Sequence, residues 1–189
     1  MTLTARDVAY SVFGAFRLAR FDATGLDYID RTPEGALRSF YAAVIVLPAY
    51  VLILLLRNWE RIAGAPLFTA LTVESIAYVV SWTAYPVIMH TVASMLDRAP
   101  RYPGFVAAYN WSSVVQMAVY VPVLVLAETG LLPEPLGEAL VFGVMMAMLA
   151  YQWFVLRTAL DINGFMAASL VLLDLLVSAM ISDVSDGML

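Results

Sequence analysis

The strongest constraint on the fold of this chain is one long apolar run, from Pro66 to Leu96. About 20 apolar residues in a helix cross a hydrocarbon layer about 30 Å thick, so this run can span a bilayer. It carries Glu74 and His90, the single histidine of the chain. A carboxylate and an imidazole are therefore expected in or beside the membrane, where ionisable groups are costly and usually face a protein interior or water.

The composition is that of a polytopic membrane protein. Of the 189 residues, 62% are hydrophobic and only 13% are charged, far from the average of soluble domains. The formal net charge is −5, which provides no basic surface for nucleic acid, so no nucleic-acid partner is expected. The chain has no cysteine, which excludes disulfides, iron–sulfur clusters, thiolate zinc sites and thiol nucleophiles.

Five apolar runs separated by short polar connectors predict an all-α fold, a polytopic membrane helix bundle of five transmembrane helices. Short connectors make consecutive spans antiparallel neighbours. We expect an N-terminal amphipathic helix and connector over residues 1–36, the five-helix transmembrane domain over 37–182 and an acidic tail over 183–189. The expected spans are Leu37–Leu56, Leu67–Met95, Phe105–Ala127, Ala139–Leu156 and Phe165–Ser182.

The segment from Thr4 to Arg20 predicts an amphipathic helix. Thr4 and Asp7 have the spacing of a capping box. One apolar stripe follows at helical intervals, formed by Val8, Val12, Ala15, Phe16 and Ala19. Two interpretations remain open: an interfacial helix with this stripe in the headgroup boundary, or a helix packed on the cytoplasmic face of the protein itself.

The arginines predict the orientation. Cytoplasmic loops close to the spans carry an excess of positive charge. Eight arginines fall on the side of the N-terminus, namely Arg6, Arg17, Arg20, Arg31, Arg38, Arg98, Arg101 and Arg157, and only Arg57 and Arg61 fall on the other. We therefore expect a multi-pass protein of the cell inner membrane with a cytoplasmic N-terminus and an exported C-terminus.

Six polar side chains inside the expected spans form the candidate intramembrane polar site. Depth along antiparallel spans predicts an outer layer with two carboxylates, a middle position and an inner layer. These are Glu74 and Asp174, then Gln116, then His90, Asn110 and Gln152. They serve either as a site or proton path, or as structural hydrogen bonds between helices.

Glu74 and Asp174 raise a further expectation, because two ionised carboxylates close together in hydrocarbon repel each other and lose hydration. At least one should be protonated, or bonded to a tyrosine, a glutamine or trapped water. A proton shared between the two carboxyls would join the second and fifth spans.

Catalysis and metal binding are not expected. One histidine and scattered carboxylates lack the converging spacing of a zinc or iron site. No nucleophile-elbow, phosphate-loop, dinucleotide or H-E-x-x-H motif is present. We therefore predict no enzyme activity, no metal and no cofactor.

Small residues four apart favour close contact between helices, within the chain or between chains. The pairs are Gly143 with Ala147 and Gly164 with Ala168.

In topology and texture the chain resembles bacterial members of the Yip1-like group of small membrane proteins. The stretches that carry the resemblance are SFYAAVIVLPAYVLILL and YQWFVLRTALDINGFMAASLVLLD, within about residues 35–182. The resemblance implies a helical scaffold involved in membrane organisation or protein partnering, with no catalytic residues to carry over.

Two functions follow as hypotheses. The first is a non-enzymatic inner-membrane scaffold or accessory subunit, which binds a membrane-protein partner or a second copy within the lipid bilayer through its helices. The alternative is a small transporter or proton-coupled permease that uses Glu74, Gln116 and Asp174. An inverted repeat, which many transporters have, is not evident in the sequence.

Overall fold

The computed structural model describes residues 3–189, which form helices connected by short turns and include no strand. The predicted all-α fold is confirmed. The helices are α1 (Ala5–Ala19), η1 (Ala23–Tyr28), α2 (Pro33–Ser39), α3 (Tyr41–Arg57), α4 (Trp59–Gly64), α5 (Leu67–Met95), η2 (Ala99–Arg101), α6 (Tyr102–Glu128), α7 (Glu134–Leu160) and α8 (Gly164–Gly187).

Five helical segments are long and apolar enough to cross a membrane, as the five apolar runs predicted. They are Pro33–Arg57, Leu67–Met95, Ala99–Glu128, Glu134–Leu160 and Gly164–Gly187. The protein is therefore a multi-pass membrane protein with five spans.

Most spans extend beyond the expected bounds, because polar caps and turns prolong them outside the apolar runs. The first starts at Pro33, where the side chain of Thr32 accepts a hydrogen bond from the backbone N–H of Gly35. The last continues through the acidic tail to Gly187. The connectors also hold short helices: η1 lies between α1 and α2, and α4 lies between α3 and α5.

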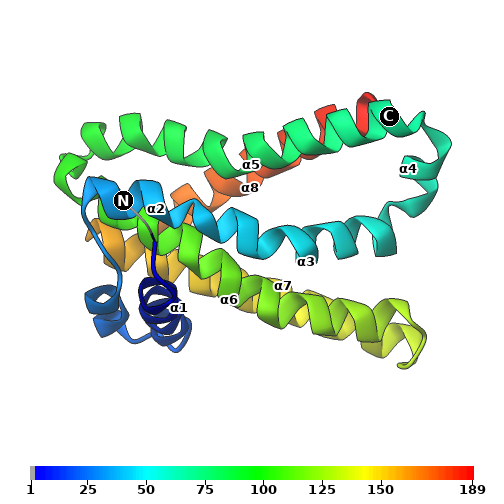
Figure 1. Ribbon diagram of the computed structural model, residues 1–189. Coiled ribbons are helices and arrows are strands. Elements are labelled where there is room, and N and C mark those ends of the chain that lie inside the picture. The colour runs from blue at the N-terminus through cyan, green and yellow to red at the C-terminus, as the bar shows by residue number, and fades with distance from the viewer. Residues whose placement is uncertain (1–2) are drawn as a thin grey trace.

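The bundle consists of three units lying side by side (Figure 1). The α6–α7 hairpin forms one layer, α5 forms the opposite layer and α3 lies between them, while α8 starts against α7 and ends beside α5. Near its turn the hairpin is tight, since a Cβ added at Gly137 of α7 would lie 3.2 Å from Ala127 of α6. The odd number of spans places the two ends of the chain at opposite ends of the bundle.

We call the two ends of the bundle the arginine-rich end and the arginine-poor end. The arginine-rich end holds α1, the η2 turn and the α7–α8 turn; the arginine-poor end holds α4, the α6–α7 turn and the C-terminus (Figure 1). Eight of the ten arginines belong to the first and two, Arg57 and Arg61, to the second.

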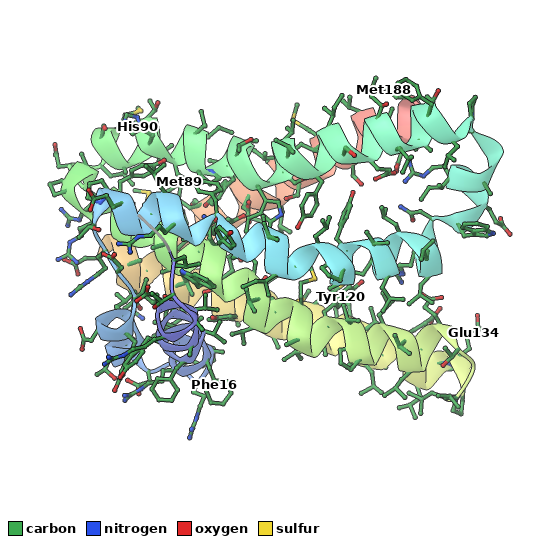
Figure 2. All side chains as sticks on the ribbon, in the orientation of Figure 1. Phe16, Met89, His90, Tyr120, Glu134 and Met188 are labelled. Atoms are coloured by element: carbon green, nitrogen blue, oxygen red, sulfur yellow. The ribbon has the colours of Figure 1, made fainter. Side chains whose placement is uncertain are left out.

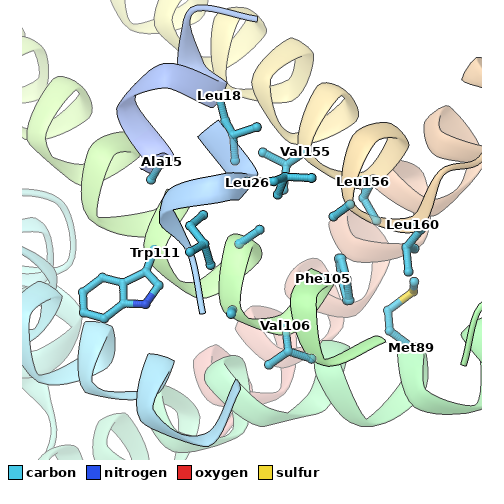
Figure 3. Close-up of a cluster of buried hydrophobic side chains, with 14 of the residues drawn as sticks. Ala15, Leu18, Leu26, Met89, Phe105, Val106, Trp111, Val155, Leu156 and Leu160 are labelled. Carbon is cyan, nitrogen blue, oxygen red and sulfur yellow. The ribbon is translucent and has the colours of Figure 1, made fainter. Parts of the chain in front are cut away.

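The main hydrophobic core lies toward the arginine-rich end. Side chains from α1, η1, α5, α6 and α7 meet there around Phe105, Leu156 and Leu160, all fully buried (Figure 3). These side chains contact one another rather than lipid or water, so the interior of this half of the bundle is densely packed.

The helix α1 lies across the α6–α7 hairpin rather than along it (Figure 1). Its capping box is confirmed: the Thr4 side chain accepts from the Asp7 N–H, and the Asp7 side chain accepts from the Thr4 N–H. The buried face of α1 consists mostly of small residues, because there is little room for a larger side chain. A Cβ added at Gly14 would lie 2.6 Å from the carbonyl oxygen of Gly25 in η1. The hydroxyl of Tyr151 in α7 fixes it further by donating to the carbonyl of Ala15 over 2.6 Å.

The opposite face of α1 is aromatic. Tyr10, Phe13 and Phe16 on α1, with Phe21 just after it, are between 46% and 53% exposed. Phe16 points away from the bundle (Figure 2). Helix α1 therefore packs on the protein itself through Gly14 and Ala15, and insertion of its apolar stripe into the headgroup boundary stays a prediction.

Candidate intramembrane polar site

Asp174 of α8 is the centre of a hydrogen-bonded cluster that links three spans. One carboxyl oxygen accepts from the Tyr109 hydroxyl of α6 over 3.1 Å, and the other accepts from the Gln152 amide of α7 over 2.7 Å. The Gln152 carbonyl in turn accepts from the Gln116 amide of α6 over 3.2 Å. Three of the six candidate residues, Gln116, Gln152 and Asp174, are thus brought together.

The expected separation of these residues into layers is wrong, and distance from the α7–α8 turn explains why. Gln152 lies eight residues before the end of α7 and Asp174 ten residues after the start of α8. At about 1.5 Å per residue, the two lie at similar depths, about 12 and 15 Å from the turn. Asp174 is therefore near the middle of the bundle, not in an outer layer.

Glu74 of α5 forms a second cluster, near the arginine-poor end. One carboxyl oxygen accepts from the Tyr50 hydroxyl of α3 over 2.8 Å, and the other accepts from the Arg61 guanidinium of α4 over 2.9 Å. Arg61 also lies 2.9 Å from a carboxyl oxygen of Asp186 near the end of α8. One arginine on a short helix thereby connects α4 to α5 and α8.

Glu74 and Asp174 do not form a pair, so the shared-proton hypothesis is wrong. Glu74 lies seven residues into α5, and Asp174 lies thirteen residues before the end of α8. Their distances from the arginine-poor end are thus about 10 and 20 Å, too far apart for direct contact. The other expectation is confirmed, because each carboxyl has a tyrosine partner, and Asp174 has a glutamine as well.

Asn110 of α6 is fully buried near the arginine-rich end, away from both clusters. Its amide donates to the Ser39 hydroxyl at the end of α2 over 2.8 Å, and that hydroxyl donates to the Ala36 carbonyl. The carbonyl oxygen of Asn110 has no partner within the described residues. This contact joins α2 to α6 inside the core.

His90 of α5 stands apart from the other five residues. It is exposed, and its ring meets the Tyr102 ring of α6 edge to face with centroids 5.1 Å apart. The Tyr102 hydroxyl donates to the Pro86 carbonyl over 2.9 Å, which holds the tyrosine in place. The expected inner layer of His90, Asn110 and Gln152 is therefore not a single cluster.

Sequence reasoning missed the partners that complete these clusters. Tyr50, Tyr109 and Arg61 supply the donors to Glu74 and Asp174, and Ser39 supplies the acceptor for Asn110. A signal was available for the tyrosines, because a buried tyrosine inside an apolar span needs a partner for its hydroxyl. Arg61 gave no such signal, since its place in a connector predicts a solvated charge.

Across residues 3–189 no three carboxylate, imidazole or thiol groups lie close enough to hold a metal ion. Comparison with protein families, curated proteins and solved structures finds no match for this chain. Function must therefore be inferred from the geometry of the chain itself.

Proposed function

We propose that the protein is a non-enzymatic scaffold or accessory subunit of the inner membrane, and that it acts by binding a membrane protein or a second copy through its helices. The Yip1-like resemblance implies the same kind of role. Two features support the proposal. The intramembrane carboxyls are already hydrogen-bonded within the protein, and α7 has an exposed face of small residues.

Both intramembrane carboxyls are engaged within the chain. Each oxygen of Glu74 and each oxygen of Asp174 accepts a hydrogen bond from a side chain of another helix. Interhelical hydrogen bonds of this kind hold membrane bundles together. This favours structural links over the proton-coupled transport that would have used Glu74, Gln116 and Asp174.

The observation that carries the proposal is a patch of small residues on α7 that no other part of residues 3–189 covers. A Cβ added at Gly143 would meet no atom within 4 Å, and Ala147 is also exposed. By contrast, a Cβ added at Gly164 would lie 3.1 Å from Trp153, so that glycine already serves a contact inside the chain. Small residues let the backbones of two membrane helices approach closely, and the Gly143–Ala147 face is free to do so with a partner.

The test is photo-crosslinking in native membranes, with the photoreactive residue at Met146 beside the patch, a position 43% exposed. We expect one dominant crosslinked species, either a second copy or another membrane protein. Gly143→Leu should abolish it, because the larger side chain holds the helices apart. Ala179→Leu, at an exposed site on α8, is the matched control and should leave it unchanged.

A crosslink that survives Gly143→Leu, or a strictly monomeric protein with no crosslink, would refute helix-mediated association at this face. Proton- or substrate-driven flux in reconstituted vesicles that is lost in Asp174→Asn would favour transport instead.

We also propose that the arginine-rich end is cytoplasmic. The eight-to-two distribution of arginines supports this orientation, because positive charge near the spans is retained on the cytoplasmic side. Reporter fusions after Arg101 should read cytoplasmic and fusions after Glu134 should read exported. The opposite pattern would reverse the orientation.

A further inference from the structure

A cavity of about 430 Å³ lies between α2, α5 and the start of α6, at the arginine-rich end. Its walls are mainly apolar, with Phe40 and Val106 among them, and its polar groups include the side chains of His90 and Ser94. Ligand sites of about 300–1,000 Å³ typically combine apolar walls with a few polar groups that orient the ligand. No side chain of the Glu74 and Asp174 clusters lines this cavity.

His90 is the hydrogen-bonding group that the cavity offers. Its ring is exposed at the cavity wall and makes no hydrogen bond with another side chain or backbone atom among residues 3–189, so its N–H is available to a ligand. The ring position is set by the edge-to-face contact with Tyr102. A neutral imidazole donates through one nitrogen and a protonated one through both, so either form can bind an anionic oxygen.

The surroundings identify the class of ligand. Leu37 lines the cavity, belongs to the first span and is 72% exposed, so the apolar wall of the cavity continues onto the outer surface of that span. Ala99 lines it from η2, the turn that also carries Arg98 and Arg101. A molecule with an apolar chain and a phosphate head satisfies both the apolar walls and the N–H of His90, whereas a free phosphate ion leaves the apolar walls unused.

We infer that this cavity binds one phospholipid from the leaflet at the arginine-rich end. An acyl chain lies against Phe40 and Val106, and a phosphate oxygen accepts a hydrogen bond from His90. The inference does not depend on the proposed partner of α7, because the cavity lies on other helices.

The test uses the full chain purified in mild detergent, with the phospholipid content counted by native mass spectrometry. Ser94→Trp fills the cavity; its hydroxyl donates only to the His90 carbonyl of its own helix turn, so the fold loses little. Met95→Trp is the matched control, since Met95 is 78% exposed and does not line the cavity. His90→Phe keeps the ring contact with Tyr102 but removes the donor.

We expect the wild type and Met95→Trp to retain one phospholipid, and Ser94→Trp to retain none. His90→Phe should bind it about tenfold more weakly. Equal retention by the wild type and Ser94→Trp overturns the site. Equal affinity of the wild type and His90→Phe for the phospholipid overturns the role of His90, and equal affinity of the wild type for a phospholipid and for a long-chain alcohol, which lacks the phosphate, overturns the choice of a phosphate head. Melting temperatures within a few degrees of the wild type confirm that each variant is folded.

Discussion

The Asp174 cluster gives the sharpest test of a structural role for the intramembrane carboxyls. Asp174→Leu removes both acceptors and leaves the Tyr109 hydroxyl and the Gln152 amide without partners. Interhelical hydrogen bonds in membrane proteins contribute about 0.6 kcal/mol on average and up to about 1.7. The loss of two should therefore lower the free energy of unfolding by about 1–3 kcal/mol.

Asp174→Asn should have a much smaller effect. The amide oxygen still accepts from Gln152, and the amide nitrogen can donate to the Tyr109 hydroxyl, which both donates and accepts. Both hydrogen bonds survive with one of them reversed, so we expect a loss of less than about 0.6 kcal/mol, the average value of one such bond.

The assay is reversible unfolding by titration of sodium dodecyl sulfate into mild-detergent micelles, followed by circular dichroism and tryptophan fluorescence. Tyr109→Phe completes a double-mutant cycle with Asp174→Leu and should show coupling, because one bond is lost in both variants. An asparagine variant as unstable as the leucine variant would show that the carboxyl itself is required. A leucine variant as stable as the wild type would show that the cluster does not hold the helices.

Three further predictions concern the ends of the bundle. Because the chain has no native cysteine, a spin label on Phe16→Cys should be more accessible to oxygen than to a polar relaxation agent, and the reverse is expected for the exposed control Glu34→Cys; equal values would remove α1 from the headgroup region. Arg61→Leu leaves the buried Glu74 without its cation and should cost about 3 kcal/mol in the same titration, part of it recovered by adding Glu74→Gln, and no recovery would contradict the ion pair. Hydrogen bonds from Thr24, together with Arg17, lower the pKa of Asp22 below its ordinary 3.8. The contribution of Asp22 to the docking of α1 should therefore be complete above pH 3.8 and lost as the pH falls through the lowered pKa. The mobility of the spin label on Phe16→Cys, measured against pH, should show a weaker acid transition in Asp22→Asn, and an unchanged transition would exclude Asp22 as its cause.

The spans and the cap of α1 were predictable because their signals are local. The length of an apolar run and the spacing of Thr4 and Asp7 can both be read directly from the sequence. The Asp174 cluster was not predictable in the same way. Depth along a helix can be counted, but the side that Gln152 faces depends on how α7 rotates against α6 and α8, which no short stretch specifies.

Two other features escaped prediction for a related reason. Gly14 and Gly25 pack against each other across a turn. An isolated glycine in a sequence does not indicate which residue it will contact. Arg61 lies in a connector and acquires its partners only because the bundle brings α4 within reach of Glu74 on α5 and Asp186 on α8. In both cases the contact exists only in the assembled bundle.

The hydrogen bond from Tyr151 to Ala15 joins residues 136 positions apart, and this separation limits the order in which the chain can assemble. At about 5–20 residues per second, the ribosome delivers Tyr151 about 7 to 27 seconds after Ala15. Until then α1 has no α7 to lie against. The packing of α1 against α7 therefore forms late in biogenesis, once the fourth span has been made. In a nascent chain stalled before Tyr151, α1 should be cleaved by proteases that the finished protein resists.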